Sequence, residues 1–107
     1  CETFAMAEKL GLDLQTFYNS SSQASGQCWS MTSYCPVPGV GPTTPADNDY
    51  KGGFAAGLML KDLRLAMDAA DQADAAGPLA QRARALYEDF VGAGNADVDF
   101  SGIIRTL

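Results

Sequence analysis

The sequence predicts an all-α domain of five or six helices with one long loop rich in proline and glycine. Apolar residues recur at steps of three and four in the second half, and no run alternates between apolar and polar as a half-buried strand would. Four of the five prolines lie between residues 35 and 52, where they interrupt regular structure. With 107 residues, 47% of them hydrophobic and 19% charged, the chain fits one globular domain or part of one.

The first part of the chain predicts two helices. Residues 1–10 contain strong helix formers, and Gly11 follows where a left-handed residue commonly ends a helix. A shorter helix is expected over residues 13–19, with Asp13 as its N-cap. The small, polar residues 20–26 predict a turn.

A third short helix is expected over residues 27–34. The loop of residues 35–52 follows, in which we expect no regular element. Loops of this length are uncommon in compact domains and are usually functional or disordered.

Three helices are expected after the loop. Residues 54–76 form a long helix, whose predicted buried face is Met59, Leu63, Ala66, Ala70 and Ala73. Gly77 is expected to end it as the C′ residue, and Pro78 to begin a helix over residues 78–91. The predicted face of this second helix is Leu79, Ala83, Leu86 and Phe90. Asp99 is expected to cap a final short helix.

Composition excludes several classes of function. Seven Lys and Arg against 13 Asp and Glu give a net charge of −6, which argues against nucleic acid or an anionic membrane as the main partner. No apolar run is long enough to cross a bilayer. There is no histidine, so histidine-dependent catalytic triads and most zinc or iron sites are excluded, and we expect no metal. A general acid or base would have to be Lys, Asp, Glu, Tyr or Cys.

The three cysteines, without a CxxC motif, favour reduced thiols over a disulfide scaffold. Cys28 is predicted to be a small buried apolar residue, because no cation lies near it in sequence to lower its pKa. The chain begins at Cys1 within a helical pattern and not at Met, so we expect residues to precede it. No secretory signal pattern is present.

Lys61 and Asp62 have two interpretations. They can form a solvated pair of neighbouring charges, which is the common case. Lys61 lies among apolar residues near the start of the long helix, however, and a half-buried ammonium there would hold a phosphate, carboxylate or carbonyl oxygen.

Trp29, Tyr34 and Phe54 are ambiguous in the same way. Each can belong to the core. Each can also form a pocket wall, in which the indole N–H and the phenol O–H would be donors that orient a ligand.

Four segments carry a resemblance to the β-hydroxyacid dehydrogenase family, and two of them point to its 3-hydroxyisobutyrate dehydrogenase branch. The Lys61-Asp62-Leu63 segment is shared across the wider family. The segments Cys28-Trp29-Ser30 and Pro36-Val37-Pro38-Gly39-Val40 are specific to the branch. The fourth is Asn48-Asp49-Tyr50-Lys51-Gly52-Gly53-Phe54, and the similarity covers the whole chain.

The resemblance implies a fold and an activity. Residues 1–107 would be the α-helical C-terminal domain, for substrate and oligomerisation, of a 6-phosphogluconate-dehydrogenase-like enzyme. An N-terminal Rossmann domain that binds NAD would be absent from this chain. The complete enzyme would oxidise 3-hydroxyisobutyrate to methylmalonate semialdehyde in valine catabolism. The family's catalytic lysine would precede Cys1, since Lys9 lacks an asparagine four residues on, so the chain alone is expected to be inactive.

The resemblance also assigns site residues. Lys61 matches a lysine that contacts the cofactor, and Phe54 would lie near the nicotinamide. Trp29, Tyr34 and Asp62 would belong to the substrate pocket. The implied partners are a small-molecule substrate, the chain's own Rossmann domain and further copies of the protein. The location would be the bacterial cytoplasm or the mitochondrial matrix.

Three alternatives stay open. The chain can be a free-standing helical interaction module derived from such a domain. The preferred substrate can be a related β-hydroxyacid. The choice between NAD and NADP depends on residues that this chain does not contain.

Overall fold

The computed structural model describes residues 1–107 and confirms the all-α fold. The α-helices are α1 (Glu2–Lys9), α2 (Leu14–Ser21), α3 (Trp29–Thr32), α4 (Ala56–Gln72) and α5 (Pro78–Phe90). Three short helical segments of other types are η1 (Pro45–Asn48), the π-helical η2 (Val91–Asn95) and η3 (Phe100–Thr106). The only extended pairing is a single antiparallel bridge between Ala55 and Asp99.

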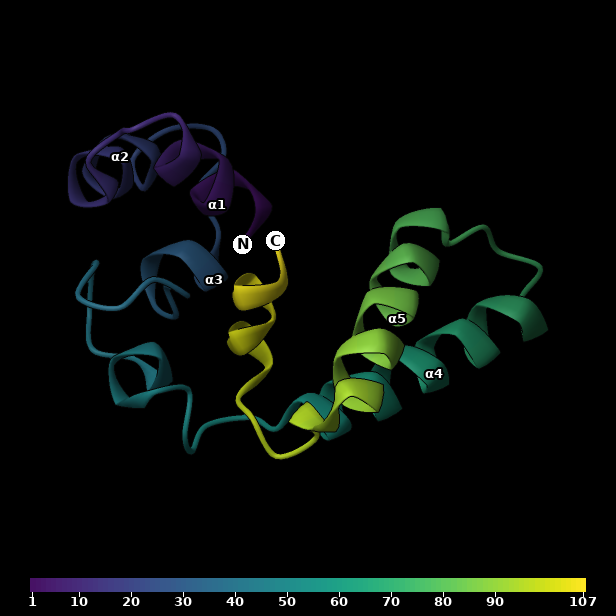
Figure 1. Ribbon diagram of the computed structural model, residues 1–107. Coiled ribbons are helices and arrows are strands. Elements are labelled where there is room, and N and C mark those ends of the chain that lie inside the picture. Colours follow the sequence, from purple (N-terminus) through teal and green to yellow (C-terminus); the bar gives the residue numbers. More distant parts are fainter.

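The molecule is open and has two parts. In Figure 1, α1, α2, α3 and η1 lie on one side, the α4–α5 hairpin projects on the other, and η3 runs between them. The radius of gyration is 14.7 Å, whereas a compact domain of this length has a value of about 13 Å. Only 16 of the 107 residues are buried. Much of the apolar surface is therefore left uncovered by the chain itself.

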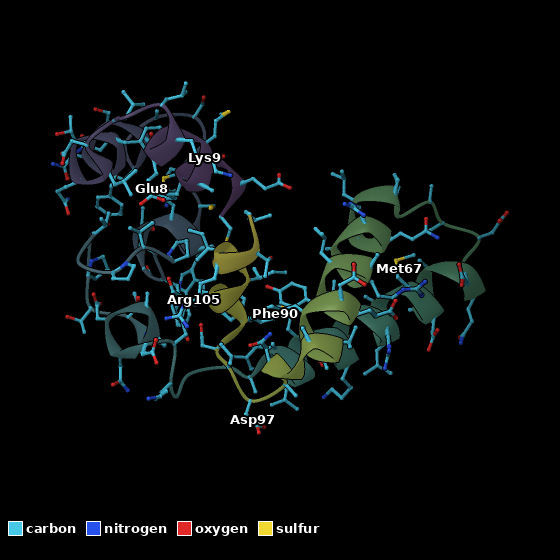
Figure 2. All side chains as sticks on the ribbon, viewed as in Figure 1. Glu8, Lys9, Met67, Phe90, Asp97 and Arg105 are labelled. Atoms are coloured by element: carbon cyan, nitrogen blue, oxygen red, sulfur yellow. The ribbon has the colours of Figure 1, made fainter.

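Each part has its own small core. The first is built around Phe4, Cys35 and Val40, and the second around Ala56, Phe90 and Ile103. The two cores meet at η3, because Ile104 packs against the first and Ile103 belongs to the second. Phe90 lies on the side of α5 that faces η3 (Figure 2).

The start of the chain folds as expected. Gly11 has a φ of +76° just after α1, and the Asp13 carboxylate accepts a hydrogen bond from the Thr16 amide at the start of α2. The predicted helix over residues 27–34 is reduced to the four residues of α3. Trp29 and Met31, two residues apart, cannot share one face of a longer helix.

The loop contains a regular element that we did not expect. Residues Pro45–Asn48 form η1, and the Thr44 side chain and the Asp47 carboxylate cap it reciprocally. Asp47 also accepts a hydrogen bond from the amide of Gly39, at 2.6 Å. Pro45 stands at the first position of this helical turn, where its missing N–H costs nothing. A proline in the sequence therefore started a helical turn here instead of preventing one.

The predicted buried face of α4 is displaced by one residue. Ala56, Leu60 and Met67 are buried, whereas Ala66 and Ala73 of the predicted face are exposed. Successive residues of a helix are about 100° apart around its axis, so the buried stripe of α4 lies beside the predicted one. On α5, Phe90 is buried as expected but Leu79 is 86% exposed.

The long helix also ends earlier than predicted. It stops at Gln72, and Asp74, with a φ of +50°, takes the left-handed position expected for Gly77. Gly77 is instead the N-cap of α5, which begins at Pro78. None of the helices is both long enough and apolar enough to span a membrane.

Candidate functional site

Three aromatic rings form a continuous stack beside η3. The Trp29 and Tyr34 rings are stacked with centroids 5.1 Å apart, and the Tyr34 and Phe100 rings with centroids 5.2 Å apart. Phe54 meets the edge of Phe100 at 6.1 Å. Trp29 is the outermost ring and is 60% exposed. The stack therefore presents one indole face to the surroundings and is supported from behind by Phe100.

The hydroxyl of Tyr34 forms its hydrogen bond with another residue of the chain. It donates a hydrogen bond to Oδ2 of Asp99 at 2.8 Å. Burial, followed by this hydrogen bond and the Asp99 charge, raises the pKa of Tyr34 to about 12. The phenol O–H, which the pocket-wall interpretation offered as a donor to a ligand, therefore has its one hydrogen already used within the molecule. The ring face is what Tyr34 contributes.

Asp99 was expected only as a helix cap, and it does more. Its side chain is fully buried and caps η3 through the Ser101 amide at 3.0 Å. The same carboxylate accepts hydrogen bonds from the Tyr34 hydroxyl and from the Phe54 amide, both at 2.8 Å. A buried carboxylate needs such donors, because an unpaired charge away from water is costly.

Gly53 allows this close packing. It has a φ of +72°, and a side chain there would overlap Asp99 Oδ2, the Tyr34 hydroxyl and Pro45. Two consecutive glycines before the aromatic Phe54 were visible in the sequence, as was an Asp-Phe-Ser segment near the end. Phe54 and Asp99 are 45 positions apart, so their contact could not be predicted from either segment alone.

Lys61 and Asp62 lie in the first half of α4 and form an ion pair of 3.1 Å. The Lys61 side chain is 60% exposed, so the half-buried ammonium of the second interpretation is not found within this chain. The solvated pair is the interpretation that the geometry supports. No hydrogen bond, ion pair or cation–π contact joins these two residues to the ring stack.

A cavity of about 210 Å³ lies behind the stack, between the start of α1, α3 and η3. Tyr34 and Phe100 contribute to its wall, together with Phe4 and Met31. Cys28 also lines it and is exposed, so the expectation of a buried Cys28 is wrong; Cys35 is the buried thiol. Cys28 is the N-cap residue of α3 and has an extended backbone.

These features define a class of protein: an all-α domain that carries an exposed aromatic stack and a surface cation. The family model described as "NAD-binding of NADP-dependent 3-hydroxyisobutyrate dehydrogenase" matches residues 1–107. The chain belongs to this family.

Individual relatives agree with the family match. A probable 3-hydroxyisobutyrate dehydrogenase of Mycobacterium tuberculosis is 49% identical over 106 residues, which is 99% of this chain and 36% of that protein. A probable mitochondrial 3-hydroxyisobutyrate dehydrogenase of Arabidopsis thaliana is 38% identical over 97% of this chain and 30% of its own length. The chain therefore spans about a third of the length of these curated relatives.

Two solved structures share the fold. The 3-hydroxyisobutyrate dehydrogenase of Mycobacterium tuberculosis, solved with L-serine, has a TM-score of 0.92 and 48% identity over 98% of this chain and 36% of that one. A 3-hydroxyisobutyrate dehydrogenase from Salmonella typhimurium has a TM-score of 0.81 and 26% identity over 99% of this chain and 35% of that one.

Proposed function

We propose that this chain is the C-terminal helical domain of a nicotinamide-dinucleotide-dependent 3-hydroxyisobutyrate dehydrogenase, and that it forms one wall of the active-site cleft. The observation that carries the proposal is the family match over all of residues 1–107. The open shape of the chain and its exposed ring stack support it, since a wall needs a surface that another domain can close against.

The residues fit one side of a nicotinamide dinucleotide. Such a molecule offers phosphate oxygens and flat rings to a protein. The exposed ammonium of Lys61 suits a phosphate oxygen, and Phe54 supplies an aromatic ring two residues before the start of the same helix. No strand followed by a glycine-rich turn and a helix is present to cradle the diphosphate, so a second domain would hold most of the cofactor.

When bound, the dinucleotide supplies a hydride acceptor for oxidation of the primary alcohol. Trp29 and Tyr34 would exclude water from the substrate pocket, which protects a hydride in transfer. Asp62 would lie at the edge of this pocket and hold Lys61 in place through their ion pair. The proton of the alcohol would pass to a lysine upstream of Cys1, so residues 1–107 alone would be inactive.

The proposal extends to the biological setting. The product of this oxidation would be methylmalonate semialdehyde, a step in valine catabolism. The relatives from Arabidopsis, Drosophila and human are named as mitochondrial proteins. We would place this protein in the mitochondrial matrix of a eukaryote or the cytoplasm of a bacterium.

The test is a spectrophotometric assay of the protein expressed from its complete reading frame. We expect reduction of NAD or NADP with 3-hydroxyisobutyrate, and a lower kcat/KM with L-serine and other β-hydroxyacids. The isolated chain of residues 1–107 is the matched control and should show no turnover. A reading frame without a Rossmann region, or a complete protein inactive with every β-hydroxyacid, would favour a helical interaction module instead.

A further inference from the structure

One oxygen atom links the two subsites of the proposed cleft. Asp99 Oδ2 accepts a hydrogen bond from the Tyr34 hydroxyl and another from the Phe54 amide, both at 2.8 Å. Tyr34 belongs to the proposed substrate wall, and Phe54 to the proposed cofactor contact. The relative position of these two walls therefore depends on a single buried carboxylate.

The carboxylate itself is held rigidly. Its second oxygen, Oδ1, accepts hydrogen bonds from the Ser101 amide at 3.0 Å and the Ser101 hydroxyl at 2.5 Å. The backbone on both sides is also fixed, because the Asp99 amide donates to Tyr50 and the Phe100 amide donates to Phe54, at 2.9 and 2.8 Å. Four donors match the four acceptor positions of an ionised carboxylate.

This arrangement controls the ring stack. The Tyr34 ring lies between Trp29 and Phe100, so a rotation of Tyr34 would displace the exposed indole that rests on it. The hydroxyl bond to Asp99 restrains that rotation at the far end of the ring. The Phe54 amide stands two residues before α4, the helix that carries Lys61.

We propose that Asp99 is a positioning residue of the dehydrogenase, which sets the substrate-facing rings of Tyr34 and Trp29 at a fixed distance from the cofactor-facing start of α4. The proposal rests on the proposed function. Asp99 touches neither substrate nor cofactor and acts through Tyr34 and Phe54. It is the one side chain that bonds to both subsites.

The test uses the complete enzyme and three variants. Tyr34→Phe keeps the ring and removes only its bond to Asp99, so we expect the KM for the hydroxyacid to rise about 3- to 10-fold with the cofactor KM unchanged. Asp99→Asn keeps one acceptor oxygen and replaces the other by an NH₂ donor, so it cannot accept from all four donors, and either the Tyr34–Phe54 pair or the Ser101 cap that holds the side chain in place is lost. We expect it to raise both KM values. The double variant should match Asp99→Asn, because the hydroxyl acts through the carboxylate.

Tyr87→Phe is the matched control. Its hydroxyl donates to the Phe100 carbonyl at 2.9 Å, so the same chemical change removes one hydrogen bond on the other side of η3. We expect both KM values to stay within twofold of the wild type. A similar loss of thermal stability in Tyr34→Phe and Tyr87→Phe, with a change in KM only in the first, separates positioning from stability.

Several outcomes would overturn the proposal. Unchanged KM values in Asp99→Asn, with only the melting temperature lowered, would make Asp99 purely structural. Fold-changes that multiply in the double variant would show that Tyr34 and Asp99 act independently. If Asp99→Asn does not fold, an unchanged hydroxyacid KM in Tyr34→Phe rejects the proposal by itself.

A spectroscopic readout separates this proposal from the proposed function. The ¹⁹F NMR signal of 5-fluorotryptophan at position 29, assigned by its loss in Trp29→Phe, should shift in Tyr34→Phe and remain in place in Tyr87→Phe. If the wild-type enzyme does not oxidise any β-hydroxyacid, the proposed function fails while this signal still reports whether Asp99 orients the stack. An unshifted signal in Tyr34→Phe contradicts the positioning role.

Discussion

The guanidinium of Arg105 lies 4.3 Å from the centre of the Tyr50 ring and also bonds to the carboxylate of Asp49. Asp49 and Tyr50 both have left-handed backbone angles, with φ values of 53° and 57°, and a bulky residue pays about 1–2 kcal/mol for that conformation. Arg105 projects from η3 toward this part of the loop (Figure 2). The last helix thus stabilises a strained turn that leads toward the site.

Arg105→Ala should therefore loosen the loop. We expect the free energy of unfolding to fall by about 1 kcal/mol, from the lost cation–π contact and a partly exposed ion pair. Urea denaturation measures the loss, and hydrogen exchange should quicken at the amides near Tyr50. Arg82→Ala is the control, because Arg82 is exposed and makes no ion pair. Equal effects of the two substitutions would contradict the role of Arg105.

Stability should fall in strongly alkaline solution. Burial, together with Asp99, raises the pKa of Tyr34 and of Tyr87 to about 12, from an ordinary value of 10.0. The folded state then holds these protons more tightly than the unfolded state. The stabilisation is complete below pH 10 and is lost as the pH rises from 10 toward 12. Urea denaturation at a series of pH values checks this, and Tyr34→Phe or Tyr87→Phe should each flatten the decline.

Gly53→Ala and Gly52→Ala form a matched pair. Both glycines have positive φ, but only a side chain at Gly53 would meet Asp99, Tyr34 and Pro45; nothing lies within 4 Å of one at Gly52. We expect Gly52→Ala to cost about 1 kcal/mol from backbone strain alone. Gly53→Ala should cost about 2–4 kcal/mol, because overpacking is added. Thermal unfolding compares them, and a cost at Gly53 no larger than at Gly52 would refute the close approach.

Lys61→Ala should weaken the contact with the cofactor. In the complete enzyme we expect the KM for the dinucleotide to rise about tenfold, a typical loss of about 1.4 kcal/mol for one charge-assisted hydrogen bond. Lys51→Ala is the control, since Lys51 is also an exposed lysine paired with a neighbouring aspartate, at 3.6 Å. An unchanged cofactor KM in Lys61→Ala would reject the assignment of Lys61.

The isolated chain should associate. Exposed apolar side chains gather on and after α1, namely Met6, Leu10 and Leu12, and such patches favour contact with another surface. Phe4 of the same helix does not belong to this exposed set, because it is buried in the first core. Light scattering should give a dimer or a larger species, and Met6→Glu with Leu10→Glu should reduce it. A monomer at high concentration would contradict the expectation.

Local chemistry predicted some elements well. Asp13 and Asp99 each cap the helical segment expected to follow them, and Pro78 is the first residue of α5, as expected. These signals depend on neighbours within a few residues. The all-α class followed from the same local patterns.

Long-range packing decided what the sequence could not predict. Met59 and Leu60 are both apolar, and the helical pattern alone does not determine that Leu60 is the buried one. The bond between Tyr34 and Asp99 joins residues 65 positions apart, so no local pattern shows that the phenol hydrogen is used internally. The sequence singled out Trp29, Tyr34 and Phe54, but it gave no sign that the Asp99 carboxylate bonds to the latter two.

The two ends of the chain lie next to each other (Figure 1), and the Lys9 ammonium donates to the carbonyl of Leu107 at 2.7 Å. A short glycine linker could therefore join residue 107 to residue 1. New ends could be opened in the exposed link between α4 and α5, at Ala75 and Ala76. Circular permutation of this domain would thus leave both cores and the buried carboxylate network intact.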